Sequence, residues 1–498
     1  MKTLFSSLFP IIFLFVCIHS NCGVKVVLHG DITMEDTEND VNPEIFYEDI
    51  ETQDEKKFNF QNWILKIGSE YGDGCSTLLT NNEIEFTAIC VTYSSNKKLW
   101  ILQMDYYGNI LSQKAITPLT YFEIGSAERF SNGGIIIAGK IEEEYSNKDK
   151  TWVIKINSLG EILWQKTFEL SNFSTGATYM TITSDEEIII ATLYPIITGE
   201  NDGYFVPAII KLDYEGNIIW YKAFNFNLGS EITTLTTNSS GDIYIAVCKF
   251  DSRFSGPWLL KLDENGNILW QKVFDFPSSL NWVPYFSDIL LTSDGSIILV
   301  GTTNGEFEES GDMWILKLND SGNIIWQKTI GEERGRKSWG AASVIEAKNG
   351  EILVGGSGVF YSQYIYTYDM ILLKLDNDGN LLWNKVISYN EQDYLENIIE
   401  SPDGDIIFEG SSGLVGNYFG DISSYDILIG KINGNGEFNG TCDLIKDMSL
   451  IFQDGEAIAF ESNIEFFNAT IPTVNEIEFP IYEADTIGEF LCTGETQP

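Results

Sequence analysis

The chain has 498 residues, 44% of them hydrophobic, which is the composition of a folded protein rather than a disordered one. Its 73 acidic and 30 basic residues give a net charge of −43, which argues against a protein that grips nucleic-acid phosphates. The two histidines, His19 and His29, both lie near the N-terminus, so the rest of the chain offers no histidine for a catalytic triad or a zinc site.

Residues 1–22 have the pattern of a secretory signal peptide. Lys2 provides the positive start, and a mostly apolar stretch runs from Leu4 to Ile18. A membrane anchor is the alternative, but the stretch is shorter than the roughly 20 apolar residues of a membrane span. We therefore expect a secreted protein, extracellular or periplasmic, with no transmembrane segment. Lipid anchoring at Cys22 is the less favoured alternative. Residues 23–59 are predicted to be an acidic linker, because their Asp and Glu residues show no apolar period.

One sequence pattern recurs along the chain, as in WLLKLDENGNILWQK at 258–272. It has the alternation of a β-hairpin around an Asn- and Gly-containing turn. The turn glycines follow one another at intervals of 50 to 57 residues: Gly108, Gly160, Gly216, Gly266, Gly322, Gly379 and Gly436. A second hairpin precedes each copy, as in SDGSIILVG at 293–301. A period of this length indicates a repeat architecture.

Four antiparallel strands in each of seven repeats predict an all-β fold, a seven-bladed β-propeller of four-stranded antiparallel blades over residues 60–437. The segment 62–68 resembles the fourth strand of a repeat but comes before any first strand. The last repeat has only a weak fourth strand. We therefore expect the N-terminal strand to close the ring by pairing with the strand near 425–432. Residues 438–498 no longer follow the repeat and are predicted to be a small C-terminal β extension or cap.

The 12 tryptophans test this interpretation. Ten occupy two fixed positions of the repeat, so packing between neighbouring blades explains them better than ligand binding does. Trp282 and Trp339 lie outside these positions, in loops that connect one repeat to the next.

The hairpin pattern K-x-D-x-x-G-x-x-x-W resembles the tryptophan-docking repeat of quinoprotein-like propellers, of the type found in extracellular surface proteins. The resemblance covers about 60–433 and implies the fold. The dehydrogenases of that group bind their cofactor beside a vicinal cysteine pair, and this chain has no adjacent cysteines. No cofactor and no redox activity are therefore expected.

Two cysteine pairs are disulfide candidates in a secreted chain. Cys75 and Cys90 fall side by side if their strands pair across the turn near Asn82, and Cys442 and Cys492 bracket the C-terminal segment. Cys248 is left over and is expected to be a small buried hydrophobic residue. No cysteine spacing predicts a zinc site, and hairpin chemistry explains the calcium-like run 376–380, so no metal is expected.

The variable loops between repeats open on one face, which is the natural place for specificity. Trp282, Trp339 and Tyr389 are the candidate ligand-binding residues there. We predict a secreted, non-catalytic propeller that serves as a binding or interaction scaffold for a protein or carbohydrate ligand, with no catalytic residues. One alternative is a carbohydrate-active enzyme that uses paired loop carboxylates, which an inward-facing cluster of acids in the central channel would favour. Another is a structural envelope component that assists outer-membrane assembly.

Overall fold

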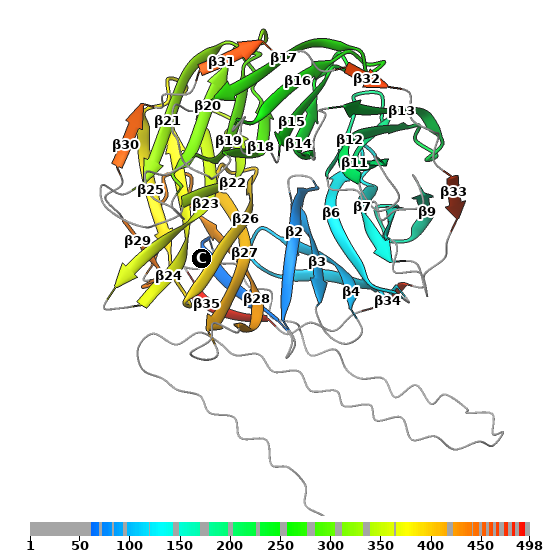
Figure 1. Ribbon diagram of the computed structural model, residues 1–498. Helices are drawn as coiled ribbons and strands as arrows, with labels where there is room; N and C mark the ends of the chain where they lie inside the picture. The colour runs from blue at the N-terminus through cyan, green and yellow to red at the C-terminus, as the bar shows by residue number, and fades with distance from the viewer. Residues whose placement is uncertain are drawn as a thin grey trace, which may run out of the picture.

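The computed structural model is an all-β propeller, in which the β-sheets are arranged in a ring (Figure 1). It describes residues 61–493 apart from 69–71, 82–83, 93–96, 119, 143–148, 170–178, 198–202, 226–229, 250–255, 276–283, 304–310, 332–338, 363–364, 416–421, 441, 448–450, 455–457, 462–464, 468–472, 477–480 and 484–487. In this part of the chain no helix is long and apolar enough to cross a membrane.

Five sheets are separate from one another, and each contains four consecutive strands of the chain. The first two are β2 (Asp73–Thr80), β3 (Glu85–Thr92), β4 (Lys98–Asp105) and β5 (Ile110–Ile116), then β6 (Phe122–Arg129), β7 (Ile135–Glu142), β8 (Asp149–Ile156) and β9 (Ile162–Glu169). The third is β10 (Tyr179–Ile182), β11 (Ile188–Ile197), β12 (Gly203–Leu212) and β13 (Ile218–Asn225). The fourth and fifth are β14 (Ser230–Thr237), β15 (Ile243–Lys249), β16 (Trp258–Leu262) and β17 (Ile268–Asp275), then β18 (Tyr285–Leu291), β19 (Ile297–Thr302), β20 (Met313–Leu318) and β21 (Ile324–Gly331).

The remaining repeats join into one ten-stranded sheet, so the expected seven separate blades are wrong. It contains β22 (Trp339–Glu346), β23 (Ile352–Ser362), β24 (Ile365–Leu375), β25 (Leu381–Ile387), β26 (Gln392–Glu400), β27 (Ile406–Val415), β28 (Ile422–Ile432) and β1 (Trp63–Ile67). Tyr368 in the long strand β24 lies opposite Gln392 at the start of β26, and the Tyr368 amide donates to the Glu391 carbonyl at 2.9 Å. Only residues 388–391 separate β25 from β26, which brings the start of β26 beside β24.

The C-terminal segment adds one outer strand to every sheet except the ten-stranded one, to which it adds two. Its strands are β29 (Ile445–Lys446), β30 (Ile451–Asp454), β31 (Ile458–Glu461), β32 (Glu465–Phe467), β33 (Thr473–Glu476), β34 (Ile481–Glu483) and β35 (Gly488–Thr493). The separate sheets are therefore five-stranded rather than four-stranded. The C-terminal strands do not form a separate small β extension among the described residues, because each pairs with a strand of the propeller.

The expected pairing of the N-terminal strand is confirmed. In β1, Trp63 lies opposite Lys431 and Ile67 lies opposite Ile427, both in β28. Residues from the two ends of the propeller therefore share one sheet, and a segment near residue 65 closes a ring that ends near residue 430.

The second strand of each repeat is buried on both faces, because neighbouring sheets pack against it. In β7, for example, Ile135, Ile136 and Ile137 are all buried. This explains why the second strands have continuous apolar runs, whereas the outer strands alternate between apolar and polar residues.

A contact between successive repeats recurs around the ring. The tryptophan of a fourth strand packs on the turn glycine of the next repeat: Trp164 on Gly216, Trp220 on Gly266, Trp270 on Gly322, Trp326 on Gly379, and Trp383 on Gly436. Gly322 has φ +74°, and a Cβ atom there would lie 3.0 Å from the Trp270 ring. The position therefore needs glycine both for its left-handed backbone and for the close approach of the indole.

The same turn also receives polar contacts from the preceding repeat. Trp270 donates its indole N–H to the Asp320 carbonyl at 3.0 Å, and Lys261 donates to the Asp320 carboxylate at 2.7 Å. Lys155, Lys211 and Lys374 likewise donate to carbonyl oxygens of the following turn at 2.8–3.1 Å. These lysines are buried. The next repeat thus satisfies cations whose burial without a partner would be costly.

We predict that Trp270→Ala lowers the free energy of unfolding by about 2–4 kcal/mol, since it removes a half-buried indole and one hydrogen bond. Leu269→Ala is the matched control, because the adjacent side chain is 52% exposed and its loss should cost less than about 1 kcal/mol. Denaturant unfolding of both variants measures the difference. Equal losses would contradict the role assigned to the tryptophan.

Candidate binding site in the central channel

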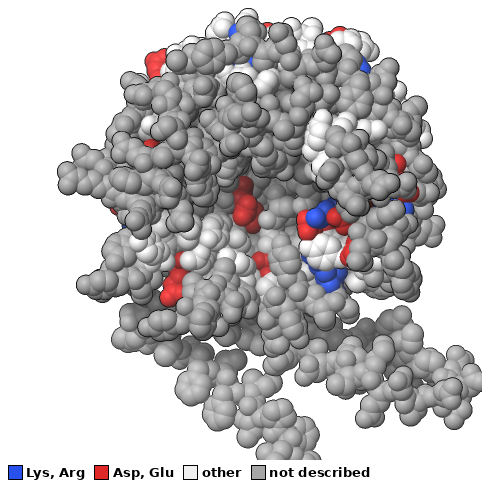
Figure 2. Space-filling view, viewed as in Figure 1, with Lys and Arg blue, Asp and Glu red and all other residues white. Residues whose placement is uncertain are grey.

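A cavity of about 650 Å³ lies in the central channel, where the first strands of the repeats meet. Residues from β2, β6, β10, β14, β18, β22 and β26 line it. Figure 2 shows a hollow in the middle of the face, with acidic side chains visible inside it.

A β-bulge occurs at the same place in six of these inner strands. The extra residue in each is Ser76, Gly125, Thr233, Ser287, Ala342 or Glu396. A bulge changes the direction in which neighbouring side chains point. Here five of the six extra residues line the cavity: Ser76, Gly125, Ser287, Ala342 and Glu396.

Several polar groups of the lining link adjacent inner strands. Asp288 accepts the amide of Ile289 at 2.8 Å and the amide of Val344, in the next inner strand, also at 2.8 Å. The Ser126 hydroxyl donates to the Met180 carbonyl at 3.3 Å, and the Ser287 hydroxyl donates to the Ala341 carbonyl. These bonds hold the wall of the channel together and fix where its remaining polar atoms point.

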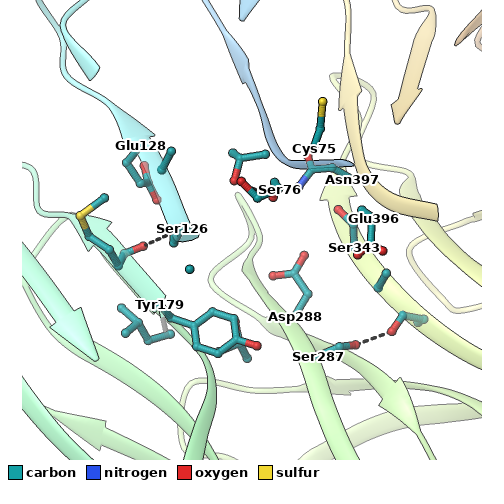
Figure 3. A pocket seen from close by; sticks show the side chains of 18 of the residues that line it. Cys75, Ser76, Ser126, Glu128, Tyr179, Ser287, Asp288, Ser343, Glu396 and Asn397 are labelled. Atoms are coloured by element: carbon teal, nitrogen blue, oxygen red, sulfur yellow. Dashed lines mark hydrogen bonds between the residues drawn. The ribbon is translucent and has the colours of Figure 1, made fainter. Parts of the chain in front are cut away.

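Three carboxyl groups face the cavity from different strands. Figure 3 shows Glu128 of β6, Asp288 of β18 and Glu396 of β26 pointing into it. Burial raises the pKa of Glu128 to about 7, although a hydrogen bond from Thr181 acts to lower it. Burial likewise raises the pKa of Asp288 to about 7, although the hydrogen bonds from the two backbone amides act to lower it. Burial also raises the pKa of Glu396. At neutral pH the channel wall therefore holds protonated and ionised carboxyls together.

The lining also determines which ligands fit. The other lining residues are mainly Ser, Thr, Tyr, Asn and small apolar residues, and neither Lys nor Arg is among them. The described residues contain no group of three or more His, Cys, Asp or Glu side chains placed to hold a metal ion. Such a wall suits a neutral or cationic ligand with several hydrogen-bonding groups, and it disfavours an anion.

A fourth carboxyl lies behind this wall. Glu409 of β27 is fully buried, and burial, followed by the charge of Glu396, raises its pKa well above the ordinary value. Burial beside Glu396 therefore disfavours an ionised carboxylate at this position.

A second cavity of about 200 Å³ shares Cys75 and Ser76 with the channel wall. Lys97 lies over the Tyr121 ring at 4.4 Å, and Tyr121 donates to Glu123 at 2.6 Å. Glu123 also pairs with Lys140 at 3.0 Å. Burial lowers the pKa of Lys97, against the opposing charge of Glu123. The polar groups of this small cavity largely satisfy one another, which makes it a weaker candidate than the channel.

Of the three candidate binding residues, the structure describes Trp339 and Tyr389. Trp339 belongs to β22 and is fully buried, with its ring at 5.0 Å from Phe360, so the expectation of an exposed loop residue is wrong. Tyr389 is half-buried, and its amide donates to Asp393 at 2.6 Å. Trp282 lies outside the described residues.

Sequence reasoning missed the channel carboxyls for a physical reason. It placed the candidate carboxylates in the loops and named no acid of the channel, whereas Glu128, Asp288 and Glu396 belong to inner strands. Because a bulge shifts the alternation by one residue, the strand period does not show which of these acids face the channel. The available signal was an acid inside the first strand of a repeat, as in YFSDILL at 285–291.

Both candidate disulfides are present. Cys75 is bonded to Cys90 across β2 and β3, and Cys442 is bonded to Cys492. Cys248 is buried and belongs to neither disulfide, as expected.

No protein-family model matches the chain, and no curated protein matches it. Among solved structures, it is similar to a protein of unknown function from Dyadobacter fermentans, with 10% identity over 62% of this chain and 94% of that one, at a TM-score of 0.39. It is also similar to a puromycin hydrolase, with 10% identity over 71% of this chain and 53% of that one, at 0.43. A third is the polysaccharide lyase Uly1, with 12% identity over 62% and 90%, at 0.39. The propeller assignment therefore rests on the sheet topology itself.

The raised pKa of Glu128 predicts that this residue lowers the stability of the fold as the pH rises. The native carboxyl keeps its proton up to about pH 7, whereas in the unfolded chain it loses the proton near pH 4. The native state thus binds more protons between these values, so the stability contributed by this group falls as pH rises through them. We expect Glu128→Gln to be more stable than the parent by about 1–2 kcal/mol above pH 7, after allowance for screening by channel water.

The gain should shrink toward zero as the pH falls to about 4, where the carboxyl is protonated in both states. Glu437→Gln, at an exposed turn position, is the control and should leave the profile unchanged. Denaturant unfolding at a series of pH values measures both variants. A pH-independent difference between Glu128→Gln and the parent would contradict the assignment.

Proposed function

We propose that the protein is a non-catalytic β-propeller that acts as a binding scaffold, and that its ligand enters the central channel. The observation that carries this proposal is the chemistry of the channel wall, which combines hydroxyl and carboxyl groups from many strands with no basic residue among those that line it. A ring of short, hydrogen-bonded strands presents these groups on a rigid frame, as a binding site requires.

The ligand class follows from the same wall. Carboxyls that exchange between protonated and ionised forms near pH 7 both donate and accept hydrogen bonds, and the serine and threonine hydroxyls do the same. A saccharide offers matching hydroxyls, and a protein segment offers matching basic side chains. Both belong to the protein-or-carbohydrate class that the sequence predicts.

We further propose that the protein is secreted, that residues 1–22 are removed, and that residues 23–59 link the N-terminus to the propeller at 60–437. The two disulfides are compatible with an oxidising compartment. The packing of Trp270 and its equivalents on the next turn supports the resemblance to quinoprotein-like propellers, without a cofactor role.

One observation favours the carbohydrate-active alternative. Glu128 and Asp288 have pKa values of about 7, which suits general acid catalysis at neutral pH. Asp288 already has a structural role, because it accepts hydrogen bonds from the backbone amides of Ile289 and Val344. Glu128 is therefore the better candidate acid. Glu396 also faces the cavity and would have to serve as the nucleophile or base. The binding proposal ranks first because it requires no such second catalytic role.

A glycan and peptide array with the purified mature chain, with and without calcium, identifies the ligand. We predict that Glu396→Lys weakens binding of each hit at least tenfold, because it places a cation in a channel whose wall has none. Glu437→Lys makes the same charge change at an exposed turn and should leave binding unchanged. Equal binding by all three proteins would contradict the channel site. Turnover of a glycan that disappears in Glu128→Gln would favour the enzyme.

A further inference from the structure

The C-terminal strands meet the sheets in strict order around the ring. β29 pairs with β25, β30 with β21, β31 with β17, β32 with β13, β33 with β9, β34 with β5, and β35 with β1. The segment therefore passes every repeat once, in the reverse of their sequence order, and each pairing is antiparallel. Figure 1 shows these strands at the periphery of the propeller, around its full circumference.

The two ends of this segment are covalently joined. Cys442 follows the last turn of the propeller and Cys492 lies in β35, and the disulfide brings their Cα atoms to 5.6 Å after a separation of 50 residues. Both cysteines belong to one hydrophobic cluster with Leu428 and Ile64. The segment thus leaves the propeller and returns to it at nearly the same point.

The chain length matches one circuit of the disc. Five strands at about 4.8 Å spacing place the outer strand about 19 Å from the inner one, and the channel adds several ångströms to the radius. A circle of roughly 25 Å radius has a perimeter of about 160 Å, which is about the length that residues 443–491 span at about 3.3 Å each. A segment of this length goes round once with little slack.

We infer that residues 442–492 form a covalently closed belt that locks the propeller ring from its rim. The individual belt strands are short, from the two residues of β29 to the six of β35, so each pairing alone is weak. Closure of the belt makes them act together, because no single strand can leave its sheet without slack that the closed segment does not have.

The belt closes at the seam of the ring. β1 lies between β28 and β35, so the N-terminal strand that completes the propeller is itself covered by the last belt strand. Ile64 of β1 lies opposite Cys492, which is bonded to Cys442. The bond therefore helps to hold β1, the strand whose departure would open the ring. β35 also covers an edge of β1 that would otherwise be available to pair with another chain.

The test compares Cys442→Ser/Cys492→Ser with the matched control Cys75→Ser/Cys90→Ser, both in a Cys248→Ala background. The control also loses a disulfide, but one that joins two neighbouring strands of one hairpin. Hydrogen exchange is measured on β1, on β29–β35 and on the interior strand β7. We expect exchange in the belt and in β1 to rise at least tenfold in the opened-belt variant only, with β7 unchanged, and its melting temperature to fall by about 5 °C.

Size-exclusion chromatography provides a second readout, since uncovered outer edges should give oligomers of the opened-belt variant and not of the control. If the opened-belt variant fails to fold, the folded Cys75→Ser/Cys90→Ser protein is reduced with a phosphine and its exchange followed directly. Belt exchange that is unaffected by loss of the Cys442–Cys492 bond, or equally affected in the control, would overturn the inference. Ligand binding at the channel is scored separately, so the binding proposal can fail without affecting this result.

Discussion

The contact between a tryptophan and the turn glycine of the next repeat is the interaction on which the rest of the structure depends. Trp270 covers Gly322 while its indole N–H and the buried Lys261 both bond to Asp320. Although burial alone lowers the pKa of Lys261, its hydrogen bonds with Asp320 and Tyr244 raise it above the ordinary value. Apolar packing, a hydrogen bond and a buried cation thus converge on one turn, and the packing of a tryptophan on the next turn glycine recurs at five junctions between repeats.

This contact explains both the channel and the rim. Successive repeats joined in this way bring their first strands together, where bulges and inter-strand hydrogen bonds surround a polar cavity. The fourth strands of the repeats lie at the outside of the ring. The C-terminal segment pairs with their outer edges. The binding site and the belt are in this sense the inner and outer consequences of one repeated contact.

Much of this architecture could be predicted from sequence, because residues close together in the chain determine the hairpins of each repeat. The turn glycines, the alternation of the hairpins and the orphan strand at 62–68 predicted the propeller and its closure by β1. The joining of two repeats into one sheet was not predictable, since it depends on a single parallel bridge between Tyr368 and Gln392. The C-terminal segment alternates visibly, but alternation does not reveal which strand a segment pairs with. Trp339 was assigned to a loop, but it is the first residue of β22, and the sequence does not show where the loop ends and the strand begins.

The central functional claim is that the ligand enters the channel, and hydrogen exchange of the oxidised protein with and without a saturating array hit tests it most directly. The account predicts slower exchange in the inner strands β6, β18 and β26, whose residues Glu128, Asp288 and Glu396 line the cavity, with the outer strands unchanged. Protection confined to the outer strands, or to loops remote from the cavity, would contradict it.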